Sequence, residues 1–364
     1  MTKKADGQLP AIQYLRAAAA LLVAIAHASE EAKYFFGFTP WVQTEAFGKG
    51  VDLFFVISGF IIYLSSIKLS DSPTPFMTFA KNRFIRVVPL YYISTALMVV
   101  VVVFFPGGVK EARFDIWQII TSFTFIPYAR ALDGRMAPIL SLGWTLNYEM
   151  FFYCLFSLCL LMPRRYVGFL AVAIIITLAI LGILVPKGAS APVRFWTHNI
   201  IIEFAFGIVI AMAYERYGRI KANLYVSVTL ISVGFILLYY LNTPPRPIEL
   251  PRFISAGVPA AIITLSVVLL FPAKAEARLP RIGVALGDSS YSLYLTHRFV
   301  QRPIQILTTK LSPFGAEHNG GFYLIVAVIG AVITGQVVFM TIERPLLKWM
   351  RMKMIRGRVP QGAE

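Results

Sequence analysis

The feature that most constrains the fold is a series of eleven apolar segments separated by short polar stretches. A helix needs roughly 20 apolar residues to cross the hydrocarbon core of a bilayer, and ten of the segments come close to that length. The segment 116–129 is shorter and more polar, so we expect it to be re-entrant or interfacial. The sequence therefore predicts about ten transmembrane helices. The ten segments cover residues 11–29, 51–68, 88–106, 141–162, 166–186, 198–214, 223–241, 254–272, 289–308 and 322–342.

The composition supports this interpretation, because 57% of the 364 residues are hydrophobic and only 14% are charged. A soluble domain needs more polar surface, so we predict an all-α polytopic membrane protein. No internal repeat or low-complexity linker is apparent. We therefore expect residues 1–364 to form a single membrane domain, with a short cytoplasmic tail from about residue 345.

Lysine and arginine are concentrated in alternate loops, which the positive-inside rule places in the cytoplasm. This distribution predicts that the N- and C-termini are both cytoplasmic. If 116–129 crossed the membrane, every later loop would change sides and the bias would invert. The cations concerned are Lys81, Arg83, Arg86, Arg164, Arg165, Arg216, Arg219, Lys221, Lys274, Arg278, Arg281, Lys348, Arg351, Lys353, Arg356 and Arg358.

The net charge of +16 does not indicate nucleic-acid binding, because the cations lie in short runs between apolar segments. Four scattered histidines form no recognisable zinc motif, and we predict no metal site. Cys154 and Cys159 are five residues apart, which turns them about 140° away from each other on a helix. We therefore expect two separate small apolar residues and no disulfide between them.

In the first segment an arginine and a histidine, Arg16 and His27, bracket ten apolar residues. Eleven helical steps leave the two side chains about 20° apart around the axis and about 16 Å apart along it, which is about half of the hydrocarbon thickness. Ionisable groups inside such a segment are costly and usually functional. Lys3, Lys4 and residues 26–28 also resemble a secretory signal with its cleavage site. Arg16 interrupts the apolar run, however, which favours a retained first helix.

Two carboxylates are candidates for acting on His27. Asp52 opens the second segment, where an acid complements the helix dipole and, at the outer end of an adjacent span, can also orient the histidine. Glu149 lies deep in an aromatic segment, so it must be paired, protonated or in a wet cavity. Glu203 ranks below both. Ser58-Gly59 is expected to permit close helix packing rather than to supply a nucleophile.

Arg83 and Arg86 lie at the cytoplasmic start of the third segment, three residues apart and therefore on one helical face. Two guanidinium groups suit phosphate binding, although ordinary loop topology also explains such a pair. The segment 289–308, with His297 and Arg298, is the most polar and should face the protein interior or a cavity. A hydrogen-bonded core histidine is the alternative for His297. Residues 343–345, Glu-Arg-Pro, are expected to end the last helix with a salt bridge and a helix break.

Together and in this order, these motifs resemble acyltransferase family 3, the integral-membrane O-acyltransferases that modify bacterial exopolysaccharides, O-antigens and related glycans. The resemblance covers nearly the whole chain. It implies a stand-alone, exopolysaccharide-type member without a fused hydrolase-like domain. It rests on Arg16 and His27, Asp52 with residues 54–60, Arg83 and Arg86 with residues 89–92, residues 144–153, residues 291–297 and residues 343–345.

The resemblance implies a donor, an acceptor and a location. The donor is expected to be an acyl-CoA, most often acetyl-CoA, which acts as a substrate and not as a permanently bound cofactor. The acceptor is expected to be a hydroxyl of a carbohydrate or glycolipid, and the location the lipid of the bacterial cytoplasmic (inner) membrane. In such proteins the arginine–histidine motif is essential and the paired arginines are associated with CoA. This assigns His27 to catalysis and Arg16, Arg83 and Arg86 to the donor. The oligomeric state is not predicted.

In the expected mechanism, neutral His27 removes a proton from the sugar hydroxyl as it attacks the thioester carbonyl. Asp52 or Glu149 would hold the imidazole and stabilise the imidazolium, and Tyr148 or Asn147 is a candidate donor to the oxyanion. In the alternative mechanism, His27 is itself acylated and passes the group outward. The residues expected to contact the substrate are Tyr148, His297 and Arg298.

A transporter or flippase for a glycan precursor is the alternative function, because intramembrane charges are expected there too. The sequence shows neither inverted repeats nor paired helices broken by glycine and proline, which argues against a transporter. A polytopic glycosyltransferase would normally carry an acidic catalytic loop outside the membrane. The outer loops of this chain are short and mostly lack paired acids.

Overall fold

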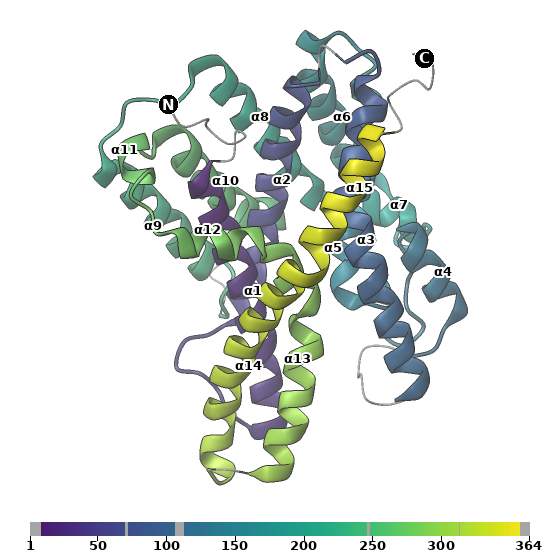
Figure 1. Cartoon of the computed structure of the whole chain (residues 1–364), viewed down its shortest axis with the longest axis vertical. Helices are drawn as coiled ribbons and strands as arrows, with labels where there is room; N and C mark the ends of the chain where they lie inside the picture. The colour runs from purple at the N-terminus through teal and green to yellow at the C-terminus, as the bar shows by residue number, and fades with distance from the viewer. Residues whose placement is uncertain (1–8, 70–71, 106–112, 246–247, 313, 357–364) are drawn as a thin grey trace.

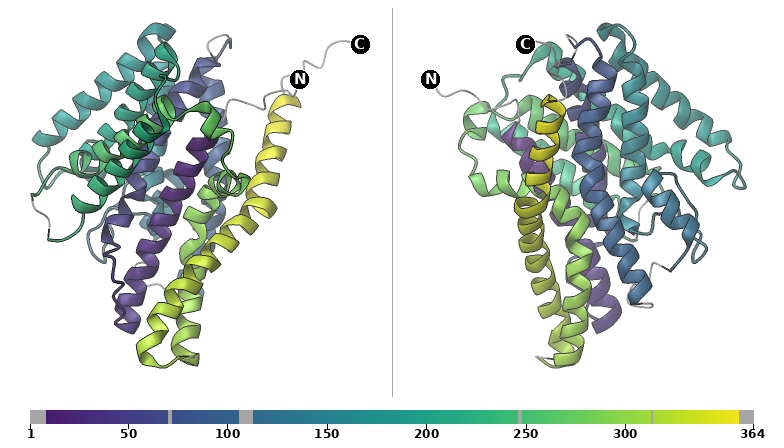
Figure 2. Two further views of the ribbon diagram at one scale, coloured as in Figure 1. Left: turned by 90° about the vertical axis from the view of Figure 1, so that its left-hand side faces the viewer. Right: turned by 45° about the vertical axis from the view of Figure 1, so that its right-hand side comes forward.

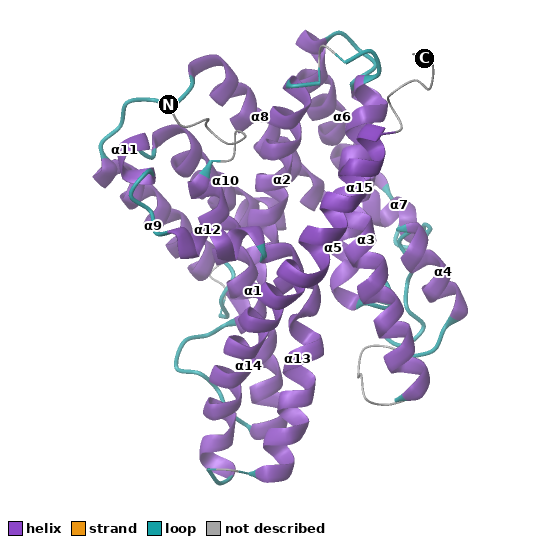
Figure 3. Ribbon diagram, in the orientation of Figure 1, coloured by secondary structure: helices purple, strands orange, loops and turns teal. Residues whose placement is uncertain are grey.

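The computed structural model describes residues 9–69, 72–105, 113–245, 248–312 and 314–356. Helices dominate, and none of the described residues belongs to a β-strand (Figure 3). The fold is therefore all-α, as the sequence predicts. Lys3, Lys4 and Arg358, which enter the arguments on charge and on a signal segment, lie outside the described residues, as does the side chain of Arg356.

Each of the ten long apolar segments forms a helix, and six helices of the described part are long and apolar enough to cross a bilayer. In Figure 1 the long helices run side by side, roughly along the longest axis. They are α1 (Pro10–Phe36), α2 (Gly50–Ile67), α3 (Pro75–Phe104), α5 (Trp144–Cys159), α6 (Arg164–Leu184), α8 (Ile202–Tyr217), α9 (Leu224–Tyr240), α10 (Val258–Leu265) between the π-turns η4 (Phe253–Gly257) and η5 (Ser266–Leu270), α13 (Ser290–Leu311) and α14 (Ala316–Val338).

Shorter elements connect these helices. They are the α-helices α4 (Ile116–Thr124), α7 (Ala191–Trp196), α11 (Ala273–Glu276) and α12 (Arg281–Asp288), and the 3-10 turns η1 (Glu45–Lys49), η2 (Ser141–Gly143) and η3 (Asn199–Ile201). The nine residues of α4 span only about 14 Å at 1.5 Å per residue, so this helix alone cannot cross a bilayer. Its N-terminus is capped by Asp115, which accepts hydrogen bonds from the backbone of Trp117 and Gln118.

Helix α2 lies at the centre of the bundle and contacts α1, α5, α8 and α10. Its closest approach is to α8. A Cβ atom at Gly59 would lie 2.2 Å from the backbone oxygen of Phe204, and one at Gly207 would lie 2.1 Å from that of Val56. Only glycine permits the two backbones to come so close. The prediction that Ser58-Gly59 serves helix packing is therefore confirmed for the glycine.

Helices α1, α13 and α14 pack together and project beyond the other helices at one end of the molecule (Figure 2). Ala28 and Ala32 of α1 contact Tyr323 and Ala327 of α14 in a small buried cluster. The small side chains let the helices approach closely. The packing of α1 on α13 also brings residue 27 of α1 opposite residue 297 of α13.

The prediction that the last helix breaks at residues 343–345 is wrong. The chain passes through the π-turn η6 (Phe339–Glu343) and continues as α15 (Arg344–Arg356). Pro345 is tolerated because it stands in the first turn of α15, directly after a wider π-turn. The expected salt bridge is present, but Glu343 pairs with Arg86 of α3, at 2.5 Å between Oε1 and Nη1.

The two cysteines are both unpaired, and they differ in their surroundings. Cys154 is exposed, whereas Cys159 is buried. The predicted placement on different faces of α5 is confirmed.

Candidate active site

A cavity of about 970 Å³ lies between α1, α2, α3, α5, α13 and α15. It follows α2 from Val51 to Leu69, a length of about 27 Å at 1.5 Å per residue. Exposed residues line one end of it, including Lys68, Asn82 and Arg351, so the cavity opens to the surface there. Its size is that of a site for a large organic ligand.

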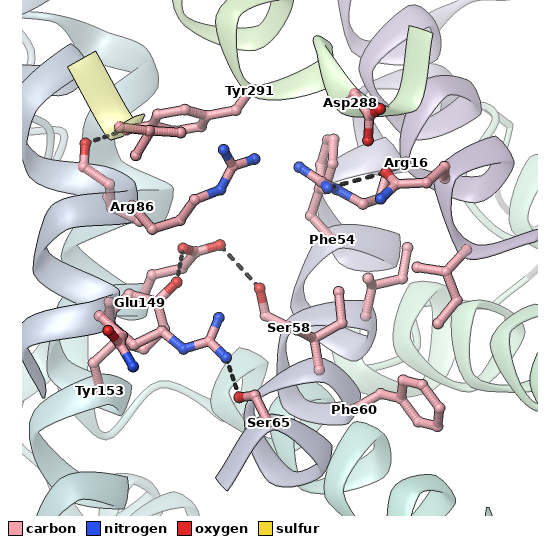
Figure 4. Close-up of a pocket in the computed structure, with 18 of the residues that line it drawn as sticks. Arg16, Phe54, Ser58, Phe60, Ser65, Arg86, Glu149, Tyr153, Asp288 and Tyr291 are labelled. Carbon is pink, nitrogen blue, oxygen red and sulfur yellow. Dashed lines mark hydrogen bonds between the residues drawn. The ribbon is translucent and has the colours of Figure 1, made fainter. Parts of the chain in front are cut away.

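The three arginines predicted to bind the donor all line this cavity. In Figure 4, Arg16 and Arg86 point toward each other across it. Arg16 donates to Gln13 Oε1 at 3.1 Å, Arg83 donates to Ser65 Oγ, and Arg86 is held by its pair with Glu343. The structure therefore brings together three cations from two helices on opposite walls of one cavity.

Glu149 faces the same cavity and is hydrogen-bonded on both oxygens. Ser58 Oγ donates to Oε1 at 3.0 Å, and the Tyr153 hydroxyl donates to Oε2 at 2.6 Å. A carboxylate at this depth needs such partners, because an unpaired buried charge is costly. The expectation that Glu149 faces a cavity or a partner agrees with the structure. Its two partners fix the carboxylate within the wall formed by α2 and α5.

His27 forms a hydrogen bond with His297, with Nδ1 of His27 and Nε2 of His297 3.0 Å apart. The two ring planes are nearly parallel, at 16°, and the ring centroids are 5.2 Å apart. His297 is fully buried, and its Nδ1 lies 3.2 Å from the backbone oxygen of Leu293. The most polar helix therefore supplies the direct partner of the first helix's histidine.

This arrangement determines which nitrogen carries each hydrogen when both rings are neutral. A carbonyl oxygen can only accept, so Nδ1 of His297 donates to Leu293. Nε2 of His297 is then an acceptor, and Nδ1 of His27 donates to it. Nε2 of His27 consequently keeps its lone pair, which is the state that a general base or a nucleophile needs.

The deep end of the cavity lies close to this histidine pair. Tyr294 lines the cavity, and its ring centroid is 6.2 Å from that of His297. The Tyr294 hydroxyl lies 3.0 Å from Thr145 Oγ1 and donates to the Leu142 carbonyl at 3.0 Å, and its ring packs against Phe54. Among the described residues that line the cavity, neither histidine is included. One aromatic layer therefore separates the cavity from His297.

The structure contradicts the expectation that Asp52 or Glu149 holds His27. Asp52 is fully buried and accepts two hydrogen bonds of 2.8 Å from Arg252, which also lies over the ring of Trp144. A buried carboxylate is best compensated by a two-pronged guanidinium partner, and Arg252 reaches it from the start of the eighth long segment. The hydrogen bonds of Glu149 go to α2 and α5, as described above. His297 takes the position that was expected for a carboxylate.

The other predicted residues lie outside the cavity wall. Tyr148 is buried and stacks on Phe195 with ring centroids 3.9 Å apart. Arg298 lies 3.8 Å from Glu31, one helical turn beyond the histidine pair. Glu203 is fully buried beside the Asp52–Arg252 pair, where its side chain fills the space above Gly257.

Sequence reasoning missed several residues of this site. Tyr294 stands three residues before His297, and this helical spacing is the signal that could have revealed it. The partners of Glu149 gave no signal, because hydroxyl side chains are common in apolar helices. Missed as well were Asp288 and the cations of α15, which line the cavity: Arg344, Lys348 and Arg351.

Comparison with known proteins agrees with this geometry. The profile of acyltransferase family 3, described as an acyltransferase domain, matches residues 9–341. The exopolysaccharide production protein ExoZ of Rhizobium meliloti (strain 1021) is 31% identical over 321 residues, with 86% of this chain and 94% of ExoZ covered. Nodulation protein 10 of Rhizobium leguminosarum bv. viciae is 23% identical over 341 residues, with 85% of this chain and 84% of that protein covered.

A third relative is the peptidoglycan O-acetyltransferase OatA of Listeria monocytogenes serovar 1/2a, 25% identical over 334 residues. The similarity covers 82% of this chain and 51% of OatA, so the chain matches about half the length of that relative. No solved structure is significantly similar to the chain. The family profile nonetheless covers most of the chain, including Arg16, His27, Arg83, Glu149 and His297. The chain therefore belongs to acyltransferase family 3 and is a helical membrane acyltransferase.

Proposed function

We propose that the protein is an O-acyltransferase that moves an acyl group, in the simplest case acetyl, from acyl-CoA to a hydroxyl of an exopolysaccharide or of its glycolipid precursor. The proposal rests mainly on the position of the cavity. The cavity is lined by cations and ends one aromatic layer away from the pair of His27 and His297, in which Nε2 of His27 has a free lone pair. The names of ExoZ and OatA, which refer to exopolysaccharide production and to O-acetylation, support the choice of acceptor and reaction.

We place the protein in the inner membrane of a bacterium, with ten spans, α4 at the interface and both termini in the cytoplasm. In Figure 1 the first turn of α1 and the last turn of α15 lie toward the same end of the molecule, which supports this topology. The cavity opens at that end, beside the cationic loops. Acyl-CoA is a cytoplasmic metabolite, so the donor enters from the side where the cavity opens.

In the proposed reaction, Nε2 of His27 takes the proton of the acceptor hydroxyl while the hydroxyl oxygen attacks the thioester carbonyl. The carbon–sulfur bond then breaks, and the thiolate leaves with the proton from the imidazolium. His297 is a positioning residue, because its Nε2 fixes the tautomer of His27 and accepts the hydrogen bond that stabilises the imidazolium. Arg16, Arg83 and Arg86 bind the anionic part of the donor.

The alternative chemistry keeps the same residues and forms an acyl-histidine. Nε2 of His27 attacks the thioester, the carbon–sulfur bond breaks, and CoA leaves as the thiolate, which leaves an acyl-imidazolium. The acceptor hydroxyl then attacks the acyl carbon, the bond from that carbon to Nε2 breaks, and the proton of the hydroxyl neutralises the thiolate. In this route the donor and the acceptor never need to be bound at the same time. Rapid mixing of the purified protein with acetyl-CoA and no acceptor separates the two routes, since only the covalent route releases a burst of about one thiol per protein molecule.

The proposed function is tested with variants in a deletion strain, with O-acetyl groups on the surface polysaccharide measured by mass spectrometry. His27→Ala is expected to lower transfer at least about a thousandfold, and His297→Ala about tenfold to a hundredfold. In initial rates of thiol release by the purified protein, the loss in His297→Ala is expected in kcat rather than in KM. The matched control is His318→Ala, because His318 is an exposed histidine at the start of α14, and full activity is expected. Normal acetylation by His27→Ala at equal protein level would reject the assignment.

A further inference from the structure

The cations of α15 form a charged face on the cavity wall. Arg344, Lys348 and Arg351 are spaced by four and three residues, which places them on one side of a helix. All three are exposed and line the cavity, together with Lys68 from the end of α2. Lys353 lies on the opposite side of α15, with Nζ 4.2 Å over the ring of Trp349.

These cations differ in their bonding from the arginines deeper in the cavity. Arg16, Arg83 and Arg86 each have a protein partner in Gln13, Ser65 and Glu343. The side chains of Arg344, Lys348 and Arg351, by contrast, form no hydrogen bond or ion pair with any described residue. Their charges are thus available to a ligand.

The shape of the cavity determines which part of a long donor reaches this face. The cavity extends about 27 Å along α2, with its deep end at Tyr294 and its open end at Lys68 and Arg351. A linear donor with its thioester at the deep end therefore has its other end at the mouth. For a CoA thioester that end is the nucleotide, which carries a 3′-phosphate monoester with a charge near −2.

We propose that the α15 face, chiefly Lys348 and Arg351, binds a phosphate monoester dianion, the 3′-phosphate of the CoA donor. This inference rests on the proposed function, because it takes the donor to be a CoA thioester. Two cations one turn apart match the two charges of the group, and a guanidinium can donate two parallel hydrogen bonds to it. Arg16, Arg83 and Arg86, which lie deeper in the cavity, are then available to bind the diphosphate and the pantetheine arm of the donor.

The phosphate of an anionic lipid also presents negatively charged oxygens, and it can reach the end of a helix at the membrane surface. The experiment therefore uses protein in nanodiscs of phosphatidylcholine alone and, in a second arm, nanodiscs that contain phosphatidylglycerol. An effect of the α15 cations that exists only with phosphatidylglycerol overturns the proposal in favour of lipid binding.

The main measurement compares two donors that differ only in the 3′-phosphate, acetyl-CoA and acetyl-3′-dephospho-CoA, by release of the thiol. Lys348→Ala/Arg351→Ala is expected to raise the KM for acetyl-CoA by about tenfold or more, as for a lost charged hydrogen bond. The KM for the dephospho donor is expected to change by less than about twofold, with kcat unchanged for both. Lys353→Ala, which removes a cation from the opposite face, is expected to change neither KM. Equal shifts for the two donors would overturn the proposal.

A binding measurement separates this inference from the proposed function. Adenosine 3′,5′-bisphosphate is expected to bind the wild-type protein more tightly than adenosine 5′-monophosphate does, and Lys348→Ala/Arg351→Ala is expected to remove the difference. If the wild type releases no thiol from acetyl-CoA but shows this pattern of binding, the proposed donor chemistry fails and the phosphate site stands. If the wild type turns over acetyl-CoA and binds the two nucleotides equally, the phosphate site fails and the proposed function stands.

Discussion

The Asp52 carboxylate has no exposed surface, and its charge is compensated by two parallel hydrogen bonds from one guanidinium group, that of Arg252. The pair joins the first turn of α2 to the residue that precedes η4. Removal of Arg252 leaves Asp52 as an uncompensated buried charge, which is far more costly than the loss of an exposed pair. At the residue scale this ion pair is therefore a structural clamp rather than part of the histidine's chemistry.

Arg252→Ala is expected to destabilise the purified protein by about 3–5 kcal/mol, seen as a lower midpoint of thermal unfolding in detergent. Asp52→Ala is expected to cost less, because 26% of the Arg252 side chain is exposed to solvent. The double variant is expected to cost less than the sum of the two, because Asp52 is then not left as a lone buried charge. The matched control is Lys33→Ala, which breaks an exposed pair with Glu45 and is expected to cost less than about 1 kcal/mol. If Arg252→Ala resembled Lys33→Ala in stability, the clamp would be refuted.

Helical periodicity could predict which side chains share a face on a single helix, and could not predict which helices face each other. The position of Arg83 and Arg86 on one cavity wall follows from a spacing of three residues. The bond between His27 and His297 joins residues 270 apart in the chain, and that between Asp52 and Arg252 joins residues 200 apart. Such pairs depend on tertiary packing, for which a local pattern contains no information.

At the scale of elements, the crossing of α2 and α8 depends on glycine at the point of contact. Gly59→Ala would place a Cβ atom 2.2 Å from a backbone oxygen of α8, so one helix has to move. We expect a loss of about 1–3 kcal/mol, as for an overpacked core, measured as a fall in the thermal midpoint. Gly188→Ala is the control, since a Cβ at Gly188 meets no heavy atom within 4 Å, and equal midpoints for the two variants would contradict the interpretation.

The apolar segments located every long helix, but they did not locate the helix ends. α1 continues to Phe36 and α3 begins at Pro75, well outside the predicted segments 11–29 and 88–106. Hydrophobicity marks only the part of a helix that lies in lipid, whereas the backbone continues in helical form as long as its hydrogen bonds can be made. Hydrophobicity also failed to locate α15, because its many cations give this helix the low hydrophobicity of a loop.

For the whole molecule, the proposed topology predicts that the two ends of α8 lie on opposite sides of the membrane. In a variant with Cys154 and Cys159 replaced by alanine, a cysteine at Gly188 is expected to react with a membrane-impermeant maleimide in spheroplasts. A cysteine at Ala222 is expected to react only after the membrane is opened. Labelling of both positions from the same side would refute the ten-span arrangement.

The aromatic layer formed by Phe54 and Tyr294 has a consequence for the energetics of the cell. Without it, the cavity would continue to the two imidazoles, and a chain of water and histidine conducts protons. The packed rings interrupt that conduction path. In the proposed topology, in which the cavity opens toward the cytoplasm, the rings are therefore expected to prevent a proton leak through the protein.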